Sequence, residues 1–258
     1  MAEGNIQLEK NGHIATIRIN RPEKLNSMTV EMAAQLSGHV REVNRDKDIR
    51  AVVFTGNSER AFSSGSDIKQ LDYYETPWDF RNRENEYARL IKSIRKPVIA
   101  AIKGYCLGGG LEMAVMADIR IGSYNSSYGA SEVNWGWIGG GGNSQMLPRI
   151  IGPGRALEML LTGDIIPAEE AYRLGLIDHL LPDEEVEEKA YELANKIAEK
   201  APIAIQVIKH AVRVSMNTPL DVGMEYENEL VHITFSTEDK LEGESAFKEK
   251  RRPVFKGR

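Results

Sequence analysis

The sequence predicts an α/β fold that is followed by a wholly helical C-terminal region. Short, mainly apolar runs at residues 50–55, 98–102 and 118–122 have the composition of buried strands. Segments with helical spacing of apolar residues separate these runs, which is typical of crossover connections between parallel strands. Beyond Pro182 only helical patterns follow. The three observations together favour a strand-rich part and a helical part.

Local signals assign the N-terminal elements. Residues 6–9 and 14–19 alternate apolar and polar side chains around Asn11-Gly12, which is the signature of a hairpin. A helical pattern then runs from 30 to 43, and the buried strand at 50–55 comes next. The chain is therefore expected to enter its sheet through a hairpin and a crossover helix.

Three helices are expected in the C-terminal part, at residues 184–200, 203–216 and 221–235. A charged segment then leads to the end of the chain. Lys200-Ala-Pro202 is a candidate joint between the two parts, and no low-complexity linker marks it. We therefore expect a core domain at 1–199 and a closely packed helical region at 200–258.

The overall composition argues against several classes of protein. With 258 residues the chain can bury a large core, and its net charge of −5 does not favour nucleic acid or an anionic membrane as a partner. The N-terminus resembles no signal peptide and no apolar run could span a bilayer, so a cytoplasmic protein is expected. Cys106 is the single cysteine and the five histidines lack metal-ligand spacing, so neither a disulfide nor a metal site is expected.

The segment from Lys103 to Gln145 carries the strongest chemical signal. Gly108-Gly109-Gly110 stands between a buried strand and an apolar helix. A glycine triplet is usually only a tight turn, and an acid in the first turn of a helix usually stabilises the helix dipole. Here, however, Glu112 is followed by the apolar run 113–117, where a carboxylate is costly unless it is paired, protonated or used. The first amides of such a helix can receive a negative oxygen, with Glu112 beside them as an acid or base.

A second glycine-bearing turn, at residues 61–67, follows the strand at 50–55. Two such turns could bring two backbone amides to one point, which is the minimum arrangement for holding an oxyanion. Ser63, Ser64 and Ser66 in this turn do not indicate a serine hydrolase, because no G-x-S-x-G elbow and no credible triad histidine accompany them.

Two further features of the same segment have ordinary interpretations. Gly139 to Gly142 is not followed by the lysine and hydroxyl of a phosphate-binding loop, so a close-packed backbone is expected there. Trp135 and Trp137 could line a pocket, but core positions are the default for such large apolar side chains.

Six ordered stretches of the chain share one likeness. The longest are AFSSGSDIK at 61–69, PVIAAIKGYCLGGGLE at 97–112 and YGASEV at 128–133. Shorter ones lie at 20–26, 161–163 and 168–178. Together they resemble the enoyl-CoA hydratase/isomerase family, also called the crotonase family. The resemblance implies a spiral of repeated ββα units and a C-terminal helical region that forms trimers, with a hexamer built from two trimers.

The same resemblance implies a reaction. Its substrate would be an acyl-CoA thioester, so coenzyme A is part of the substrate and no separate cofactor is implied. The amides of Ser66 and Gly109 would hold the thioester oxygen, while Glu112 and Glu132 fall where hydratases of the family carry two catalytic glutamates. The implied reaction is the reversible syn addition of water to a trans-2-enoyl-CoA, as in fatty-acid β-oxidation. Glu112 is assigned mainly to the water and Glu132 mainly to the proton at C2.

The remaining substrate contacts are also implied by the resemblance. The groove for coenzyme A would be lined by Lys24, Ser64, Ser66, Asp67, Ile68 and Gly109. The acyl pocket could be walled by Tyr73, Tyr74, Trp78 and Phe80. The basic end at 248–256 could reach the phosphates of a substrate bound to a neighbouring subunit, with a solvated tail as the equal alternative.

Departures from the family pattern leave alternatives open. Residues 138–145 read IGGGGNSQ where many hydratases read IPGxGGTQ. Residues 131–136 also resemble hydroxycinnamoyl-CoA hydratase-lyases, which usually lack a glutamate at the position of Glu112. The alternatives are such a hydratase-lyase, a Δ3,Δ2-enoyl-CoA isomerase that needs only one base, and a crotonase-fold protein that binds without catalysis.

Overall fold

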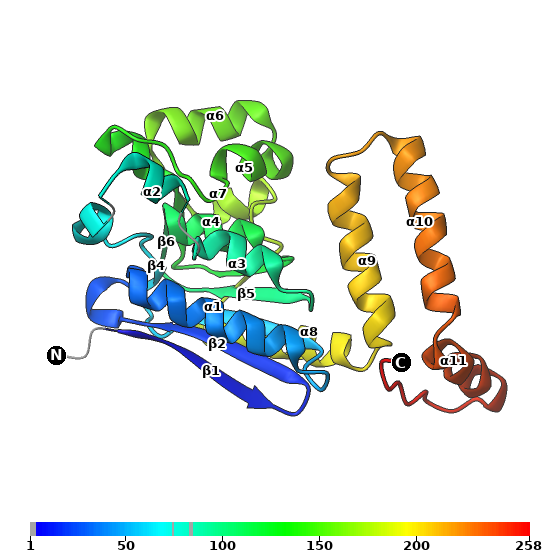
Figure 1. Ribbon diagram of the computed structural model, residues 1–258. Coiled ribbons are helices and arrows are strands. Elements are labelled where there is room, and N and C mark those ends of the chain that lie inside the picture. The colour runs from blue at the N-terminus through cyan, green and yellow to red at the C-terminus, as the bar shows by residue number, and fades with distance from the viewer. Residues whose placement is uncertain (1–3, 74, 83–84) are drawn as a thin grey trace.

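The computed structural model describes residues 4–73, 75–82 and 85–258. Within these ranges the larger sheet has the strand order β1-β2-β3-β5-β7-β10 (Figure 1). Its strands are β1 Asn5–Asn11, β2 Ile14–Asn20, β3 Ala51–Gly56, β5 Val98–Ile102, β7 Ile119–Ser123 and β10 His179–Leu181. The first two form the predicted antiparallel hairpin, and the others follow in parallel. The predicted α/β sheet is confirmed.

A smaller sheet lies beside the first, with the order β4-β6-β8-β9. Its strands are β4 Ala61–Ser63, β6 Tyr105–Leu107, β8 Ser127–Gly129 and β9 Ile165–Pro167. Each of β3, β5 and β7 in the larger sheet is followed by a strand of the smaller sheet, and β4, β6 and β8 are again parallel. This repeated alternation confirms the predicted ββα spiral. It also places the carboxyl ends of β4, β6 and β8 along one edge.

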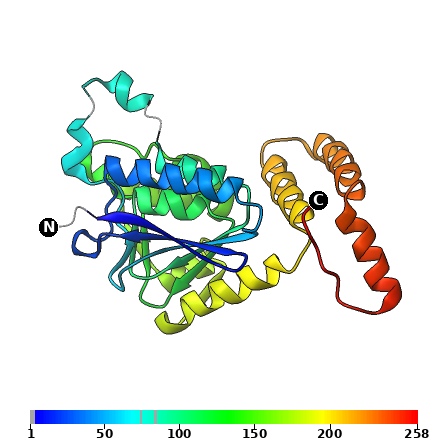
Figure 2. The same cartoon turned by 60° about the horizontal axis from the view of Figure 1, so that its bottom comes forward.

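Helices cover both faces of the larger sheet. The helical segments of the N-terminal part are α1 Val30–Arg45, α2 Pro77–Arg81, α3 Tyr87–Ser93, α4 Gly109–Met116, α5 Asn143–Ile151, α6 Pro153–Thr162, α7 Ala168–Arg173 and α8 Asp183–Ala198, with short 3-10 turns at η1 Pro22–Lys24, η2 Ile68–Tyr73 and η3 Ser131–Trp135. Helix α8 lies on one face, opposite α1 and α3 (Figure 2). Along β3, Val52 and Phe54 pack into the core of α1, α3 and α4, whereas Ala51 and Val53 pack against α8. The alternation follows from the two-residue period of a strand.

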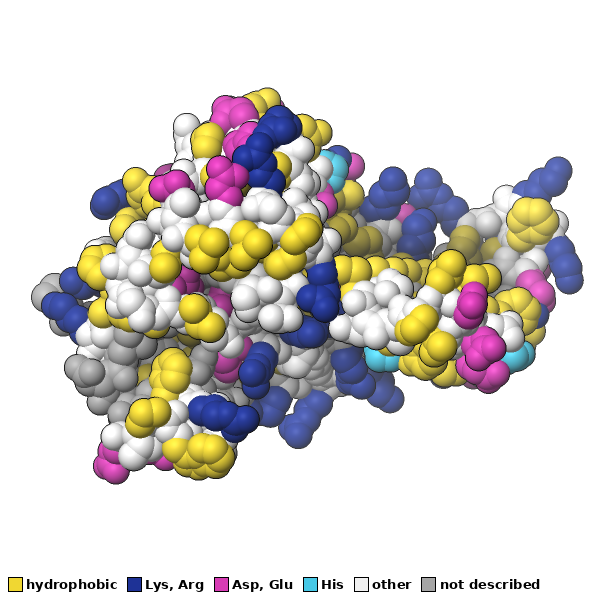
Figure 3. Space-filling model, turned by 90° about the horizontal axis from the view of Figure 1, so that it is seen from above, with side chains coloured by type: hydrophobic (Ala, Val, Ile, Leu, Met, Phe, Trp, Pro, Cys, Tyr) yellow, Lys and Arg dark blue, Asp and Glu magenta, His cyan; other side chains and the backbone are white. Residues whose placement is uncertain are grey.

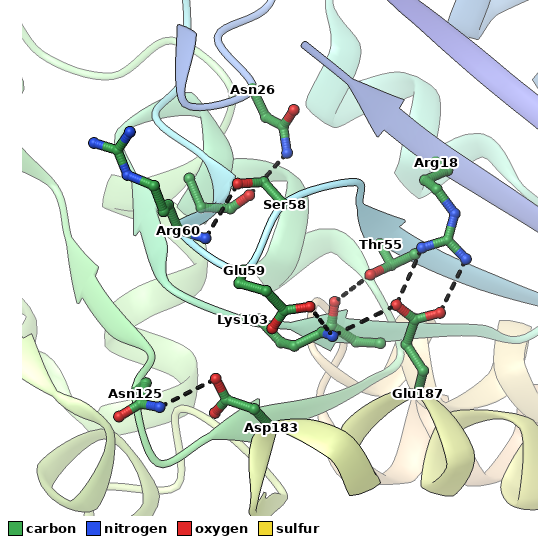
Figure 4. Close-up of polar contacts among 12 residues, drawn as sticks. Arg18, Asn26, Thr55, Ser58, Glu59, Arg60, Lys103, Asn125, Asp183 and Glu187 are labelled. Carbon is green, nitrogen blue, oxygen red and sulfur yellow. Dashed lines mark hydrogen bonds and ion pairs between the residues drawn. The ribbon is translucent and has the colours of Figure 1, made fainter. Parts of the chain in front are cut away.

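Helix α8 is also tied to the sheet by a small polar cluster (Figure 4). Glu187 of α8 accepts two hydrogen bonds from Arg18 of β2, at 3.1 and 2.9 Å. Lys103, after β5, pairs with Glu59 at 2.8 Å and lies 3.9 Å from Glu187. These charges lie near the carboxyl ends of β2, β3 and β5, and they tie α8 to the sheet.

The C-terminal helices form an arm beside the core (Figure 1). They are α9 Pro202–Ser215, α10 Leu220–Phe235 and α11 Glu238–Glu249. Lys209 and Arg213 of α9 reach the core at Asp118, at 2.6 and 3.0 Å. The last helix was not predicted as such; the Thr237 hydroxyl caps it by accepting a hydrogen bond from the Lys240 amide.

The arm exposes many apolar side chains. They lie along α9 and α10, where Figure 3 shows hydrophobic surface, and include Ile208, Val212, Leu220, Val222, Met224, Ile233 and Phe235. A groove of about 450 Å³ between the two helices is lined mainly by alanine, valine and isoleucine. Among the helices of the described residues, none is both long and apolar enough to cross a membrane.

Candidate active site

Two glycine turns meet at the carboxyl edge of the smaller sheet. β4 and β6 are parallel neighbours, so the turns that follow them leave the sheet on the same side. Gly65, with a φ of +90°, approaches the second turn so closely that a Cβ built on it would lie 2.7 Å from the Gly109 nitrogen. The structure therefore brings together the two turns that the sequence analysis singled out.

Among the described residues, no hydrogen bond occupies the two backbone amides that are expected to bind an oxyanion. Met28 and Ser66 form a parallel bridge, in which the Met28 amide donates to the Gly65 carbonyl and the Asp67 amide donates to the Met28 carbonyl. The N–H group of Ser66 lies between these two bonds and therefore points away from Met28. Gly109 is the first residue of α4, where an amide has no partner inside the helix. Both N–H groups can therefore be offered to a ligand.

Glu112 is fixed inside the protein by the start of α5. Every residue of α4 is buried, and Glu112 is only 3% exposed. Its Oε1 atom accepts hydrogen bonds from the amides of Gly141 and Gly142, at 2.6 and 3.0 Å. The backbone of the glycine run after residue 138 therefore lies directly against the carboxylate. There is no space for a side chain at Gly141, where a Cβ would lie 2.5 Å from Glu112 Oε2.

Glu132 reaches the same place from the next strand of the smaller sheet. It lies in η3, directly after β8, which pairs with β6. A Cβ built on Gly139 would lie 2.5 Å from Glu112 Oε1 and 2.9 Å from Glu132 Oε1. The two carboxylates therefore meet at Gly139, where this backbone leaves no space for a side chain.

Burial raises the pKa of both carboxylates and so disfavours their ionised forms. The pKa of Glu112 is raised to about 7, first by burial and then by the negative charges of Glu132 and Glu86, while the Gly141 amide works in the opposite direction. Burial also raises the pKa of Glu132. Two acids that interact this closely titrate as a pair, and near neutral pH the pair can hold one proton. Such a pair can take a proton on one carboxylate and give one from the other.

Two residues of the site were missed by the sequence analysis. Glu86 is 5% exposed and caps α3 by accepting hydrogen bonds from the amides of Ala88 and Arg89, at 3.2 and 2.8 Å. Next to it, the Tyr87 hydroxyl is 2.7 Å from Ser66 Oγ, and its ring lies against the Cα of Gly109. The sequence offered a weak signal only for Glu86, as a capping acid before a helical pattern.

The residues expected to bind coenzyme A border the first turn. Lys24 is exposed in η1, and that loop contacts the turn through a hydrogen bond from the Ser64 amide to the Leu25 carbonyl. Asp67 is paired with Arg21 at 2.7 Å. Burial alone would raise the pKa of Asp67, but the hydrogen bond from Arg21 keeps it below its ordinary value. Ile68 is largely exposed.

Ser63 and Cys106, which lie near the turns, have structural roles. Ser63 is fully buried, and its hydroxyl donates to the Asn26 carbonyl at 2.8 Å. Cys106 is also fully buried, and burial raises the pKa of its thiol. Neither side chain is therefore placed as a nucleophile.

The expected acyl-pocket residues are only partly placed. Phe80 and Tyr87 line a small cavity of about 50 Å³ next to Ser66, whereas Trp78 is largely exposed on α2. Tyr74 and the side chain of Tyr73 lie outside the described residues.

The interpretation of Trp135 and Trp137 as core residues was wrong for this chain. Their side chains are 62% and 40% exposed. The reason is local: η3 buries none of its residues, and Gly136, with a φ of +85°, ends it in a turn at the surface.

The basic end of the chain is held within its own subunit. Arg251 pairs with Glu242 and Glu249, each at 2.6 Å. Asp239 accepts hydrogen bonds from the amides of Lys256 and Gly257, at 2.6 and 2.8 Å. The tail is therefore folded against α11.

Comparisons with known proteins point to one family. Residues 9–258 match the family model described as enoyl-CoA hydratase/isomerase. The chain belongs to this family. A short-chain-enoyl-CoA hydratase of Clostridium acetobutylicum is 37% identical, over 98% of this chain and 97% of its own length. A crotonyl-CoA hydratase of Syntrophomonas wolfei is 36% identical, over 99% of both chains.

Another family member widens the range of acyl groups among the relatives. An (E)-benzylidenesuccinyl-CoA hydratase of Thauera aromatica is 38% identical, over 98% of this chain and 99% of its own length. Among solved structures, the enoyl-CoA hydratase of Bacillus anthracis superposes with a TM-score of 0.92 at 35% identity, covering 98% of this chain and 100% of the other.

Proposed function

We propose that this enzyme catalyses the reversible syn addition of water to a trans-2-enoyl-CoA, giving a 3-hydroxyacyl-CoA. The observation that carries the proposal is the meeting of Glu112 and Glu132 at Gly139, one turn of helix away from the Gly109 amide. Family members that are named hydratases, at 36–38% identity over nearly the whole chain, support it.

The proposed reaction uses the site in three places. The thioester oxygen is bound by the amides of Ser66 and Gly109, which stabilise the negative charge that develops as water attacks C3. Glu112 orients the water and removes its proton as the new C3–O bond forms. The electron pair of the C2–C3 double bond moves toward the thioester carbonyl, and Glu132 delivers a proton to C2. The raised pKa values of both acids suit this scheme, in which the pair takes up one proton from water and gives up another to C2.

The coenzyme A part would lie along the first turn. We propose that Lys24, Ser64, Asp67 and Ile68 border its groove, as in the family, with the Asp67 carboxylate holding Arg21 in place. The site chemistry needs no additional cofactor or metal, because the amides and the carboxylates supply the charge stabilisation and the proton transfers.

Assembly into trimers, and into a hexamer of two trimers, is also proposed. The support is the apolar surface of α9 and α10, which one subunit leaves exposed. Exposed patches of this kind usually mark an interface between proteins. Sedimentation of the purified protein would test the assembly.

The function is tested by adding the enzyme to crotonyl-CoA and following the loss of the conjugated enoyl absorbance. A chain-length series and an aromatic 2-enoyl thioester should be included, because the relative from Thauera aromatica is named for an aromatic acyl group. Conversion of any of these substrates to its 3-hydroxy product supports the proposal. An enzyme that is inert toward all of them, but moves the double bond of a 3-enoyl-CoA, would be an isomerase.

A further inference from the structure

One buried polar side chain in the site has no role in the scheme above. Asn143 is the first residue of α5 and is 1% exposed. Among the described residues, its Oδ1 atom has no hydrogen-bond partner. A buried unpaired acceptor costs on the order of 1–3 kcal/mol, so its presence needs a reason.

The other end of the same amide contacts the second glycine turn. Asn143 Nδ2 donates to the carbonyl oxygen of Gly108 at 3.4 Å. That carbonyl also accepts the first helical bond of α4, from the Glu112 amide at 3.0 Å. A carbonyl oxygen has two lone pairs, so both donors can be accommodated.

The Gly108 carbonyl and the Gly109 amide belong to one peptide unit. Because a trans peptide is planar, its C=O and N–H point in opposite directions, and holding the carbonyl sets the direction of the N–H. This peptide lies between two glycines, and Gly108 has a φ of +53°, so the chain itself restrains it weakly. The hydrogen bond from Asn143 therefore adds to the bond from the Glu112 amide in fixing the direction of the Gly109 N–H, and it also polarises this group.

We propose that Asn143 is a positioning residue for the reaction. Its Nδ2 atom holds the Gly108–Gly109 peptide so that the Gly109 amide points at the thioester oxygen. The inference rests on the proposed function, because it concerns the same oxyanion. A purely structural role would be served better by a residue that buries no unpaired acceptor.

The surrounding backbone supports this placement. The two residues before Asn143 donate their amides to Glu112, so one short segment contacts both the base and the oxyanion turn. A change at position 143 can therefore alter the oxyanion donor without removing a carboxylate. In the hydratase pattern that residues 138–145 resemble, glycine stands at this position, which makes N143G a natural variant to compare.

The test combines kinetics with a direct measurement of carbonyl polarisation. N143A and N143G are compared with the wild type in hydration of crotonyl-CoA. Removal of a complete oxyanion donor costs about 10²–10³ in kcat, so loss of the residue that orients it should lower kcat about 10-fold, with KM changed less than about 3-fold.

Binding of butyryl-CoA labelled with ¹³C at the thioester carbonyl is then followed by difference infrared spectroscopy. This saturated thioester cannot be hydrated, and its C=O stretching frequency falls as hydrogen bonding to the oxygen strengthens. We expect a smaller fall in both variants than in the wild type. N195A is the matched control: Asn195 also donates its amide to a backbone carbonyl, that of Tyr191 at 2.8 Å, but on α8 far from the turns. It should leave both readouts unchanged.

Unchanged kcat and an unchanged carbonyl shift in N143A and N143G would overturn the proposal. If N143A did not fold, N143G alone would decide. A wild type that fails to hydrate any enoyl-CoA, yet shows a carbonyl shift that N143A weakens, would refute the proposed function while supporting the role of Asn143. A wild type that shows no carbonyl shift with butyryl-CoA would refute both.

Discussion

The active site and the C-terminal tail shift the pKa values of their carboxylates in opposite directions. At the site, Glu112 is buried near two other acids and its pKa is raised to about 7. In the tail, Glu242 is hydrogen-bonded by Arg251 and by the Val254 amide, and its pKa is lowered to about 2. The first environment stores a proton that chemistry can use, whereas the second keeps a fixed charge for holding the chain. The difference shows that a carboxylate buried beside other acids retains its proton to a higher pH, whereas an exposed carboxylate paired with arginine stays charged.

The largest expected effect comes from replacing the Glu112 carboxylate by an amide. E112Q should lower kcat for hydration of crotonyl-CoA by about 10²–10⁴-fold, because glutamine cannot remove the proton of the attacking water. E242Q is the matched control in the tail and should retain nearly full activity. A small loss in E112Q, with good isomerisation of a 3-enoyl-CoA, would instead assign the chemistry to Glu132 alone.

The same substitution should stabilise the folded protein. The pKa of Glu112 lies near 7 in the folded state and near 4.5 when unfolded, so ionisation disfavours folding as the pH rises between these values. E112Q removes this penalty, and we expect about 1–3 kcal/mol of added stability at pH 8. The gain should shrink toward zero at pH 4.5.

Chemical denaturation of both proteins at pH 5 and pH 8, at one protein concentration, measures the difference. An equal effect at the two values of pH would mean that packing, and not charge, separates the variants. The stability test is independent of any substrate.

The sequence predicted most of the scaffold because its signals are local. The strands β2, β3 and β5 could be predicted because their sequences are alternating or wholly apolar, as burial requires. The hairpin could be predicted from the turn residues Asn11-Gly12. The three-residue strands β4, β6, β8 and β9 carry no such pattern, because their pairing is decided by the spiral as a whole. They were therefore missed, although they align the turns of the site.

The candidate site was predicted in part for the same reason. The two glycine turns and the acids at 112 and 132 stand out in the sequence, and the structure brings them together. Glu86, Tyr87 and Asn143 do not stand out, because each enters the site through a tertiary contact. Trp135 was misplaced, since size alone suggested burial but η3 has no face toward the core.

A smaller effect should follow from removing the third acid. The charge of Glu86 contributes to the raised pKa of Glu112, so E86Q should lower that pKa. Hydration requires ionised Glu112, and the acidic limb of the kcat profile should therefore move to lower pH, by less than about one unit. Glutamine keeps one acceptor oxygen, so one of the two hydrogen bonds that cap α3 can remain. A profile that stays in place would show that solvent screens this charge.

The smallest effect is expected where the acids are already paired. R251Q removes the partner of Glu242 and Glu249 at the exposed end of the chain. Pairs of this kind contribute little to stability, so the protein should fold and hydrate crotonyl-CoA with an unchanged kcat, while the amides of Val254 and Lys256 exchange hydrogen faster as the tail loosens. R252Q is the neighbouring control. If KM for crotonyl-CoA rose several-fold in R251Q but not in R252Q, Arg251 would bind the phosphates of a substrate held by a neighbouring subunit, and the tail would belong with the site in its function.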